Sequence, residues 1–413
     1  MLNKEFFSEI SEELHPRCKL FLSADLIRSS EQKHPIVPAD AGDQFDKDKF
    51  DTERPFDPYS RTMQYYLEDH WFSYLTEFYQ KYHQIFLDEL QVLIDADRQL
   101  GQARDQEPKC SRMNTNRIQI WKLAGDEIIY AVDVLTEDEI YMISLAFIRS
   151  IIIYRKILHD DRNYFHDDAG REFKGYRDQF SALYSKCILD VKGTIWWAGF
   201  PVSNREIVIS NEFSRADEIS KSADPRFSNL FGLKEAIDKN LYGKNSLKVD
   251  YLGPSIDIGF RLAGLSNSKQ LIISVEVAFL LNKRDSAWAL LIEGATASRK
   301  PLVMKFSGRK PLKGVFGLKP YPVFWLDSSS NEGLSFIEEE MLGATGIEKN
   351  RFLDMYFERI FKRHSRFIIE PELINMDGEY DKNSVVCNVI KRIDDVWRKE
   401  QLRQVSKADI YSE

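Results

Sequence analysis

An acid and an arginine one helical turn apart stand in the segment 249–281, VDYLGPSIDIGFRLAGLSNSKQLIISVEVAFLL. A short apolar strand carrying Asp250 breaks at a Gly-Pro pair, and proline in the first turn favours a helix that places Asp257 and Arg261 on one face. A fixed cation of this kind can stabilise charge that develops on a phosphate oxygen. An isolated acid–arginine pair at this spacing is more often a plain surface ion pair, so further signals are needed to indicate a site.

Two further segments carry polar residues next to apolar strands. In 19–30, KLFLSADLIRSS, a strand ends in Asp25, and the turn that follows can present backbone N–H groups to phosphates. In 117–130, RIQIWKLAGDEIIY, two alternating strands flank a turn that contains Asp126, with Lys122 four residues earlier. Taken alone, the first pattern is common in α/β proteins and the second predicts only a tight hairpin.

In this chain order, the three segments together resemble the class III nucleotidyl cyclases. The strand with its acid, the Gly-Pro break, the helix with a polar residue and an arginine, and the I-x-S before the next helix match the second half of that catalytic domain. The resemblance implies an α+β fold with a ferredoxin-like βαββαβ catalytic domain over 15–326. The interval between the two aspartates is longer than the family pattern, which predicts a helical insertion at about 31–110. The remaining 327–413 form a mostly helical C-terminal region of unknown role.

In that family, two aspartates hold two divalent metal ions, Mn²⁺ or Mg²⁺, and the resemblance implies this role for Asp25 and Asp126. The main-chain oxygen of Leu26 would add a further ligand. Oxygen ligands suit both ions, which would activate the attacking ribose 3′-oxygen and hold the triphosphate. The four cysteines are scattered without zinc-site spacing, so the sequence predicts no other metal site.

The resemblance also implies which residues contact the substrate. Arg261 stands at the position of the transition-state arginine, and Asp257 stands where most purine cyclases carry asparagine. An aspartate there can accept a hydrogen bond from a ribose hydroxyl but cannot donate one. A triphosphate-binding lysine is expected near the last strand pair, where Lys319 and Lys313 are both candidates; the spacing does not choose between them, and Lys319 is taken as the first candidate. Because one chain carries both half-sets of residues, a homodimer with active sites at its interface is implied.

Two signals disagree about the nucleotide. Lys122 and Asp250 sit where adenylate cyclases read adenine, which favours ATP. Three sequence segments resemble the bacterial pyrimidine cyclases of the Pycsar antiphage systems. These segments are D-Y-L-G-P-S-I-D-I-G-F-R-L, W-K-L-A-G-D-E-I-I-Y and Y-P-V-F-W-L. A smaller base leaves room that larger side chains such as Arg54, Phe56 and Tyr59 could fill. We therefore expect UTP, or else CTP, as the substrate, and a cyclic nucleotide that acts on an effector protein in antiphage defence.

Two other functions stay open at this point. The first is an adenylate cyclase that makes cyclic AMP, and the second is a non-catalytic interaction module with a cyclase fold. Retention of both aspartates, Lys122 and Arg261 argues against the module. A GGDEF-type cyclase is disfavoured because the turn Gly125-Asp126-Glu127 lacks the paired glycines with which such enzymes approach guanine.

Composition limits the partners and the location. The 413 residues are 43% hydrophobic and carry a net charge of −8, which is typical of a globular protein and argues against nucleic-acid binding. No apolar run approaches the roughly 18 residues of a membrane span, and the N-terminus lacks the apolar stretch of a signal peptide. We therefore expect a cytoplasmic protein without membrane contact.

Hydrophobic periodicity predicts the remaining elements. Apolar residues recur at three- and four-residue steps over 63–100, which predicts a long amphipathic helix or a bent pair. Also predicted are a buried helix over 137–157, strands that continue the central sheet over 188–210, a closing strand pair over 314–326, and helices over 3–14 and within 335–405.

Overall fold

The computed structural model describes most of the central part of the chain. The described residues are 17–27, 70–159, 164–166, 172–174, 189–201, 203–210, 247–296, 302–328, 351–365, 368–373 and the single positions 392, 395 and 399. The segments 3–14 and 31–61, including Arg54, Phe56 and Tyr59, lie outside these residues, as does most of 335–405.

The described chain contains both helices and strands. In order they are β1 (Arg17–Ile27), α5 (His70–Arg104), η3 (Thr115–Arg117), β2 (Gln119–Ala124), β3 (Glu127–Asp133), α6 (Glu137–His159), β4 (Tyr164–His166), β5 (Glu172–Lys174), β6 (Asp190–Phe200), β7 (Arg205–Ser210), β8 (Leu247–Leu252), α10 (Pro254–Ala263), β9 (Gln270–Ile273), α11 (Val275–Lys283), α12 (Ser286–Ala295), β10 (Met304–Lys310), η4 (Phe316–Leu318), β11 (Tyr321–Asp327) and α14 (Arg351–His364).

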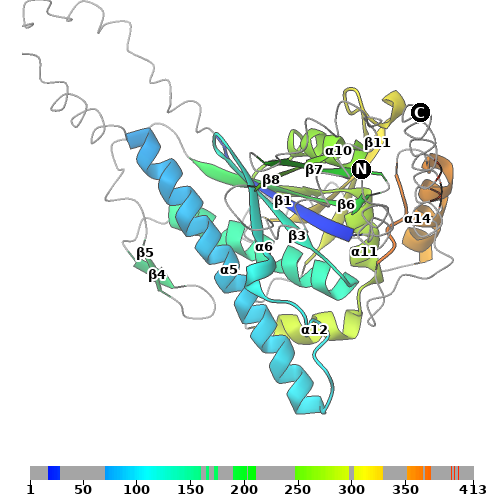
Figure 1. The fold of residues 1–413 in the computed structure, drawn as a ribbon. Helices are drawn as coiled ribbons and strands as arrows, with labels where there is room; N and C mark the ends of the chain where they lie inside the picture. The colour runs from blue at the N-terminus through cyan, green and yellow to red at the C-terminus, as the bar shows by residue number, and fades with distance from the viewer. Residues whose placement is uncertain are drawn as a thin grey trace, which may run out of the picture.

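A seven-stranded sheet forms the centre of the molecule (Figure 1), with the strand order β10-β11-β9-β6-β1-β3-β2. β1 pairs antiparallel with both β3 and β6, β2 pairs antiparallel with β3, and β6 pairs parallel with β9. The run β1-α5-β2-β3-α6-β6, with the spatial order β6-β1-β3-β2, is the ferredoxin-like βαββαβ arrangement. The predicted α+β fold class is therefore confirmed.

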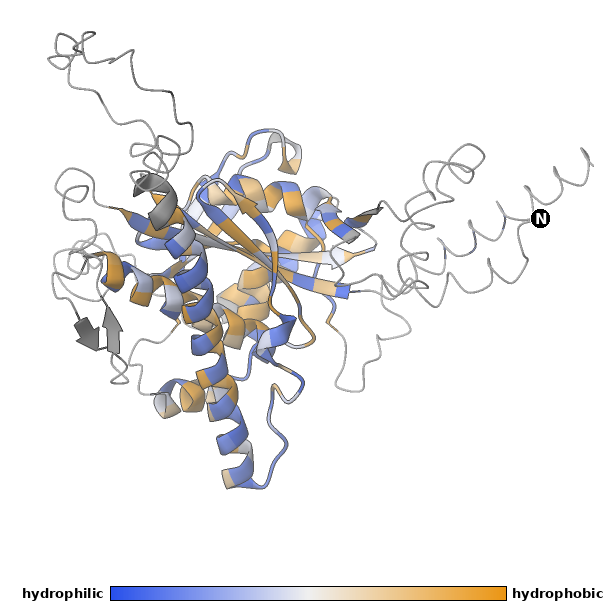
Figure 2. Cartoon of the chain, turned by 60° about the vertical axis from the view of Figure 1, so that its left-hand side comes forward, coloured by the Kyte–Doolittle hydropathy of each residue, from blue (hydrophilic) through white to orange (hydrophobic). Residues whose placement is uncertain are grey.

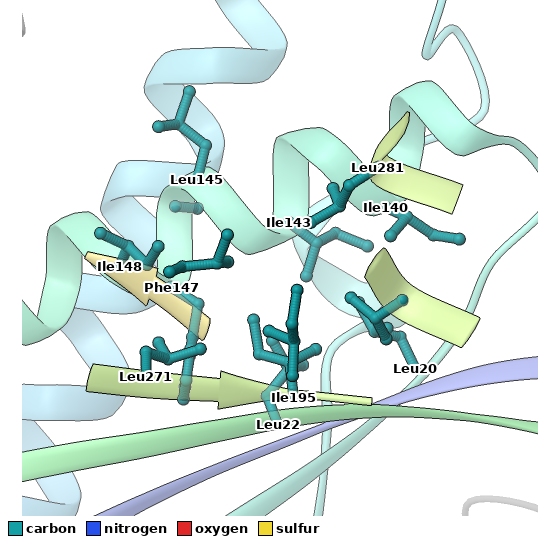
Figure 3. Close-up of a cluster of buried hydrophobic side chains, with 14 of the residues drawn as sticks. Leu20, Leu22, Ile140, Ile143, Leu145, Phe147, Ile148, Ile195, Leu271 and Leu281 are labelled. Atoms are coloured by element: carbon teal, nitrogen blue, oxygen red, sulfur yellow. The ribbon is translucent and has the colours of Figure 1, made fainter. Parts of the chain in front are cut away.

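One face of the sheet is covered by α6 and α11, and α5 packs in turn against α6 and α12. Figure 3 shows the core between sheet and helices, where apolar side chains from β1, β6 and β9 meet those from α6 and α11. The buried residues labelled there are Leu20, Leu22, Ile140, Ile143, Leu145, Phe147, Ile148, Ile195, Leu271 and Leu281. Burial of this many large apolar side chains supplies the main driving force for the fold.

The helix α5 confirms the amphipathic helix predicted over 63–100, with an end four residues later than expected. Bands of hydrophilic and hydrophobic residues alternate along it (Figure 2), as a helix with one buried side requires. Tyr82 and Phe86 are fully buried against α6, and the Ser150 hydroxyl donates to the Tyr82 oxygen at 3.0 Å. No helix in the described ranges is long and apolar enough to cross a membrane.

The other face of the sheet carries an aromatic cluster beneath α10. Phe21 of β1 stacks on Trp196 of β6 with ring centroids 5.4 Å apart, and Tyr251 of β8 meets the same Phe21 edge-on at 5.1 Å. Trp196 and Trp197 are both buried and belong to the cores on opposite faces of the sheet. Both tryptophans are therefore core residues, because helices cover both faces of the sheet.

Two strand predictions were also wrong in their pairing or position. The strand 205–210 does not continue the central sheet, because β7 pairs with β8 in a separate two-stranded sheet. The closing pair is formed by β10 and β11, so its first strand lies upstream of the predicted 314–326. The residues between these strands form a loop with the short turn η4, where Gly314 and Gly317 adopt positive φ.

The helix α14 extends the core beyond the closing pair. Phe279 of α11 contacts the rings of Phe357 and Phe361 with centroids 5.6 and 5.1 Å away. The Asn282 amide donates to Asp354 Oδ1 at 2.8 Å. These contacts bind the described helix of the C-terminal region to the same helical layer that covers the sheet.

Gly259 sets the closeness of α10 to the sheet, because a Cβ there would lie 2.4 Å from the Trp196 ring. We expect Gly259→Ala to lower the free energy of unfolding by about 1–3 kcal/mol through overpacking. The matched control is Gly294→Ala in α12, where a Cβ meets nothing within 4 Å and helix propensity favours alanine by about 1 kcal/mol. Urea titrations of both variants measure the difference, and equal stabilities would contradict this packing.

Candidate active site

Asp25 and Asp126 come together at the carboxyl end of β1. In the strand register, Asp25 lies opposite Glu127 of β3 on one side and Lys192 of β6 on the other. The Leu26 N–H donates to the Asp126 carbonyl at 3.1 Å, which fixes the β2–β3 turn beside this strand end. We call Asp25, Asp126 and Glu127 the acidic cluster.

The turn that carries Asp126 is held from outside the sheet. Gly125 adopts φ 75°, a conformation that favours glycine, and this permits a two-residue hairpin turn between β2 and β3. The Tyr79 hydroxyl of α5 donates to the Gly125 carbonyl at 2.6 Å. Thus the long helix predicted as part of an insertion contacts the turn directly and positions Asp126.

The three carboxylates create a negative field at this end of β1. Burial foremost raises the pKa of Glu127, and the nearby Asp25 and Asp126 raise it further, while the hydroxyl of Ser23 and the charge of Lys192 act in the opposite sense. Burial, followed by the charges of Asp126, Asp25 and Glu127, likewise raises the pKa of Tyr79. A cation placed here would therefore be favoured.

The residues present fit a divalent metal ion that is shared with a phosphorylated substrate. Asp25 and Asp126 supply hard oxygen ligands, and Mg²⁺ is commonly bound by one or two carboxylates with phosphates completing the shell. No group of three or more His, Cys, Asp or Glu residues with ligand geometry occurs among the described residues, so the cluster by itself is not a closed metal cage. Whether the Leu26 carbonyl is a further ligand stays a prediction.

Lys192 is a site residue that the sequence analysis missed. Its ammonium Nζ lies 3.0 Å from Asp25 Oδ2, and both side chains are about three-quarters buried, with exposed fractions of 24% and 25%. No local motif marks this lysine, because only the pairing of β6 with β1 brings it to Asp25. Lys192 thus supplies a protein cation directly beside the Asp25 carboxylate.

Lys122 and Asp250 form the second group. The Lys122 ammonium lies 2.8 Å from Asp250 Oδ1, which also accepts from the indole N–H of Trp121 at 3.1 Å and from the Tyr251 backbone N–H at 2.9 Å. Burial acts to raise the pKa of Asp250, but the hydrogen bonds from Lys122, Tyr251 and Trp121 and the charge of Lys122 together lower it. Asp250 is therefore held as a carboxylate beside a lysine, at the half-exposed edge where β2 meets β8.

Asp257 and Arg261 lie on one face of α10, as predicted, and both side chains are exposed. These two described side chains form no ion pair with each other. The spacing of Asp257 and Arg261 is therefore not explained by a surface ion pair. The helix begins at a Gly253 that must be glycine, since its φ is 145° and a Cβ would lie 2.3 Å from Asn204 Oδ1. Asn204 Oδ1 instead accepts from the Ser255 N–H at 3.1 Å, which fixes the start of α10.

Lys319 is exposed in the loop before β11, and its N–H donates to the Phe316 carbonyl at 3.1 Å. In the part of the chain described here, neither Lys319 nor Lys313 contacts any of the other predicted site residues. The structure therefore brings together Asp25 with Asp126 and Lys122 with Asp250. It leaves Asp257, Arg261 and Lys319 separately exposed.

No protein-family model matches the chain, and no curated protein matches it. Among solved structures, the chain is similar to the adenylyl cyclase CyaB from P. aeruginosa, with 11% identity and a TM-score of 0.34 over 77% of this chain and 98% of that one. It is also similar to the guanylate cyclase domain of RhGC from Catenaria anguillulae in complex with GTP, with 8% identity and a TM-score of 0.29 over 76% and 97% of the two chains. A bacterial light-regulated adenylyl cyclase gives 8% identity and a TM-score of 0.32, covering 79% of this chain and 97% of that one. Identities and TM-scores this low establish no shared activity.

If Asp25 binds a divalent cation, Lys192 competes with that cation for Asp25 Oδ2. We expect Lys192→Met to raise the affinity for Mn²⁺ about threefold or more in the absence of nucleotide, because the carboxylate loses its protein counter-charge. Isothermal titration calorimetry measures this affinity. The matched control is Lys305→Met, which removes the lysine of another buried pair, Lys305 Nζ to Asp327 Oδ2 at 3.5 Å. An unchanged Mn²⁺ affinity in Lys192→Met would show that Asp25 does not bind the cation.

Proposed function

We propose that this protein is a class III nucleotidyl cyclase that converts a nucleoside triphosphate to the 3′,5′-cyclic monophosphate and pyrophosphate. One observation carries the proposal. The hairpin β2–β3 that brings Asp126 to Asp25 also brings Lys122 to Asp250. Carboxylates that suit a metal ion and an acid–lysine pair that suits a nucleobase thus both contact one short hairpin, at positions four residues apart.

In the proposed reaction the ribose 3′-oxygen attacks the α-phosphorus and pyrophosphate leaves. Two divalent ions bound by Asp25 and Asp126, with the Leu26 carbonyl as a further ligand, would lower the charge barrier of this step. Arg261 is an exposed cation and is proposed to stabilise charge on the α-phosphate. Asp257 is proposed to accept a hydrogen bond from a ribose hydroxyl, and Lys319 is proposed to bind the triphosphate.

A homodimer with active sites at its interface is part of the proposal. Arg261 and Asp257 face away from the acidic cluster's own strands on the exposed side of α10, where a second chain can be reached. Large apolar side chains are exposed on the neighbouring elements β2, β8 and α10, namely Ile120, Leu123, Leu252 and Phe260, at 44%, 54%, 55% and 40%. Exposed apolar residues gathered around polar groups favour a protein partner, and a second copy supplies the missing half of each site.

The proposed substrate is a pyrimidine nucleoside triphosphate, with UTP favoured over CTP. Lys122 can donate to a ring carbonyl, and Asp250, held as a carboxylate, can accept from the N3–H of uracil or the amine of cytosine. The same pair also suits adenine, so adenylate cyclase is the second candidate. The proposed role of the product, a second messenger that acts on an effector protein in antiphage defence within the cytoplasm, rests on the sequence resemblance.

A competition experiment tests the activity and the substrate together. We expect purified protein with Mn²⁺ and equal concentrations of ATP, GTP, CTP and UTP to form cyclic UMP, or else cyclic CMP, as the dominant product. Liquid chromatography with mass spectrometry identifies the products. Cyclic AMP as the dominant product would contradict the pyrimidine assignment and identify an adenylate cyclase. If no cyclic nucleotide forms, the result would favour the non-catalytic interaction module.

Single substitutions test the roles proposed for the two aspartates and the arginine. We expect Asp25→Ala and Asp126→Ala each to lower activity at least 100-fold while the fold is kept, since each removes a polar ligand from a partly exposed position. Arg261→Ala should lower kcat by about 100-fold or more with a smaller effect on nucleotide affinity.

Asp25→Ala mixed with Arg261→Ala should regain activity, because each heterodimer keeps one site with its acids and arginine intact. Asp25→Ala mixed with Asp126→Ala is the matched control and should stay inactive, since both variants damage the same half-site. Failure of the first mixture to regain activity, with subunit exchange demonstrated, contradicts the shared site.

A further inference from the structure

Trp121 occupies a β-bulge in the middle of β2. In the β2–β3 register, Ile120 lies opposite Tyr130 and Lys122 lies opposite Ile129, so Trp121 is the extra residue between two successive pairs. In a regular strand, neighbouring side chains point to opposite faces of the sheet. A bulge suspends this alternation and re-aims a side chain.

The bulge lets Trp121 and Lys122 act on the same carboxylate although they are neighbours in the sequence. The Trp121 indole N–H and the Lys122 ammonium both lie within hydrogen-bond distance of Asp250 Oδ1, at 3.1 and 2.8 Å. The ammonium also lies 4.4 Å from the centre of the Trp121 ring, a cation–π distance. Trp121 therefore contacts both members of the Lys122–Asp250 pair.

The donors to Asp250 are all on one oxygen. Trp121, Lys122 and the Tyr251 backbone N–H share Oδ1, and within the described chain Oδ2 accepts no hydrogen bond. The pair thus offers a base one fixed acceptor, Oδ2, beside one donor, the lysine. Uracil, cytosine, adenine and guanine can each present a complementary donor and acceptor on one edge, so hydrogen bonding to this pair does not by itself choose the base.

The ring of Trp121 supplies the bulk beside the pair. It meets the Tyr251 ring edge-on at 5.1 Å, Phe21 edge-on at 5.2 Å and Phe260 of α10 at 5.9 Å, so three neighbours hold it in place. A held indole thus adds bulk directly beside the half-exposed acid–lysine pair that is proposed to read the base.

We infer that Trp121 is a specificity-determining residue of the proposed site, which positions Asp250 through its N–H and restricts the base to a single ring through its bulk. This inference rests on the proposed function. Two substitutions distinguish the hydrogen bond of Trp121 from its bulk. Phenylalanine keeps a ring but has no N–H, whereas alanine has neither.

The first test replaces the indole. Trp121→Phe should raise KM for the preferred triphosphate about tenfold or more, as expected for one lost hydrogen bond to a charged group, and should leave kcat and the order of base preference unchanged. Trp121→Ala should in addition raise the ATP-to-UTP ratio of kcat/KM about tenfold or more. The matched control is Trp288→Phe, which removes an indole hydrogen bond to a carboxylate on the other face of the sheet, Trp288 Nε1 to Asp97 Oδ1 at 2.7 Å. Trp288→Phe should lower stability without changing KM or the base ratio.

Binding measurements keep the inference testable apart from turnover. In an Arg261→Ala background, where chemistry is slow, calorimetry gives the Kd of UTP and ATP with and without Trp121→Ala. A changed Kd ratio supports the role of Trp121 even if wild-type protein forms no cyclic nucleotide, an outcome that would remove only the proposed function. If the ratio of the UTP and ATP Kd values is unchanged, or changes equally with Trp288→Phe, the inference about Trp121 is wrong. Neither result would contradict the proposed cyclase activity. If Trp121→Ala does not fold, the KM effect of Trp121→Phe decides.

Discussion

The pairing of β1 on both of its edges is the constraint on which the rest of the molecule depends. Eleven residues of β6 and seven of β3 stand opposite this strand, and its side chains alternate between the two cores. Leu20 and Leu22 face the helical layer, and Phe21 faces the aromatic cluster beneath α10. Because a slip by one residue would exchange these faces, the register is strongly specified, and with it the position of Asp25 at the strand end.

Charge and packing oppose each other at that strand end. Three carboxylates next to one another are unfavourable without cations, and the burial of Glu127 increases this cost. The fold tolerates the cluster because Lys192 and the Ser23 hydroxyl face it, and because Tyr79 holds the turn from α5. A stable core under the sheet thus supports a locally unfavourable group, as expected of a site built for a ligand.

The sequence predicted what depends on local pattern. The strand that carries Asp25, the hairpin at Gly125, the amphipathic α5 and the Gly-Pro start of α10 follow from apolar periodicity and turn chemistry, and all are present. β1 ends at Ile27, two residues later than expected. Partners across the sheet could not be predicted this way, because strand propensity does not specify which edge a strand joins. That is why β7 was assigned to the wrong sheet and Lys192 was missed. Trp121 was missed for a related reason, since strict alternation assigns it to the face opposite Lys122, and only the bulge cancels that alternation.

The long separation of the contacts at Asp250 has a consequence for how the protein is made. Trp121 and Asp250 are 129 positions apart, whereas Asp25 and Asp126 both belong to the first third of the chain. Because a chain is synthesised from its N-terminus, the strands of the acidic cluster leave the ribosome well before β8 and α10 do. Premature termination or proteolysis before β8 removes Asp250, Asp257 and Arg261 at once. In the proposed homodimer, such a fragment would supply only carboxylates and would leave one of the two sites without its arginine.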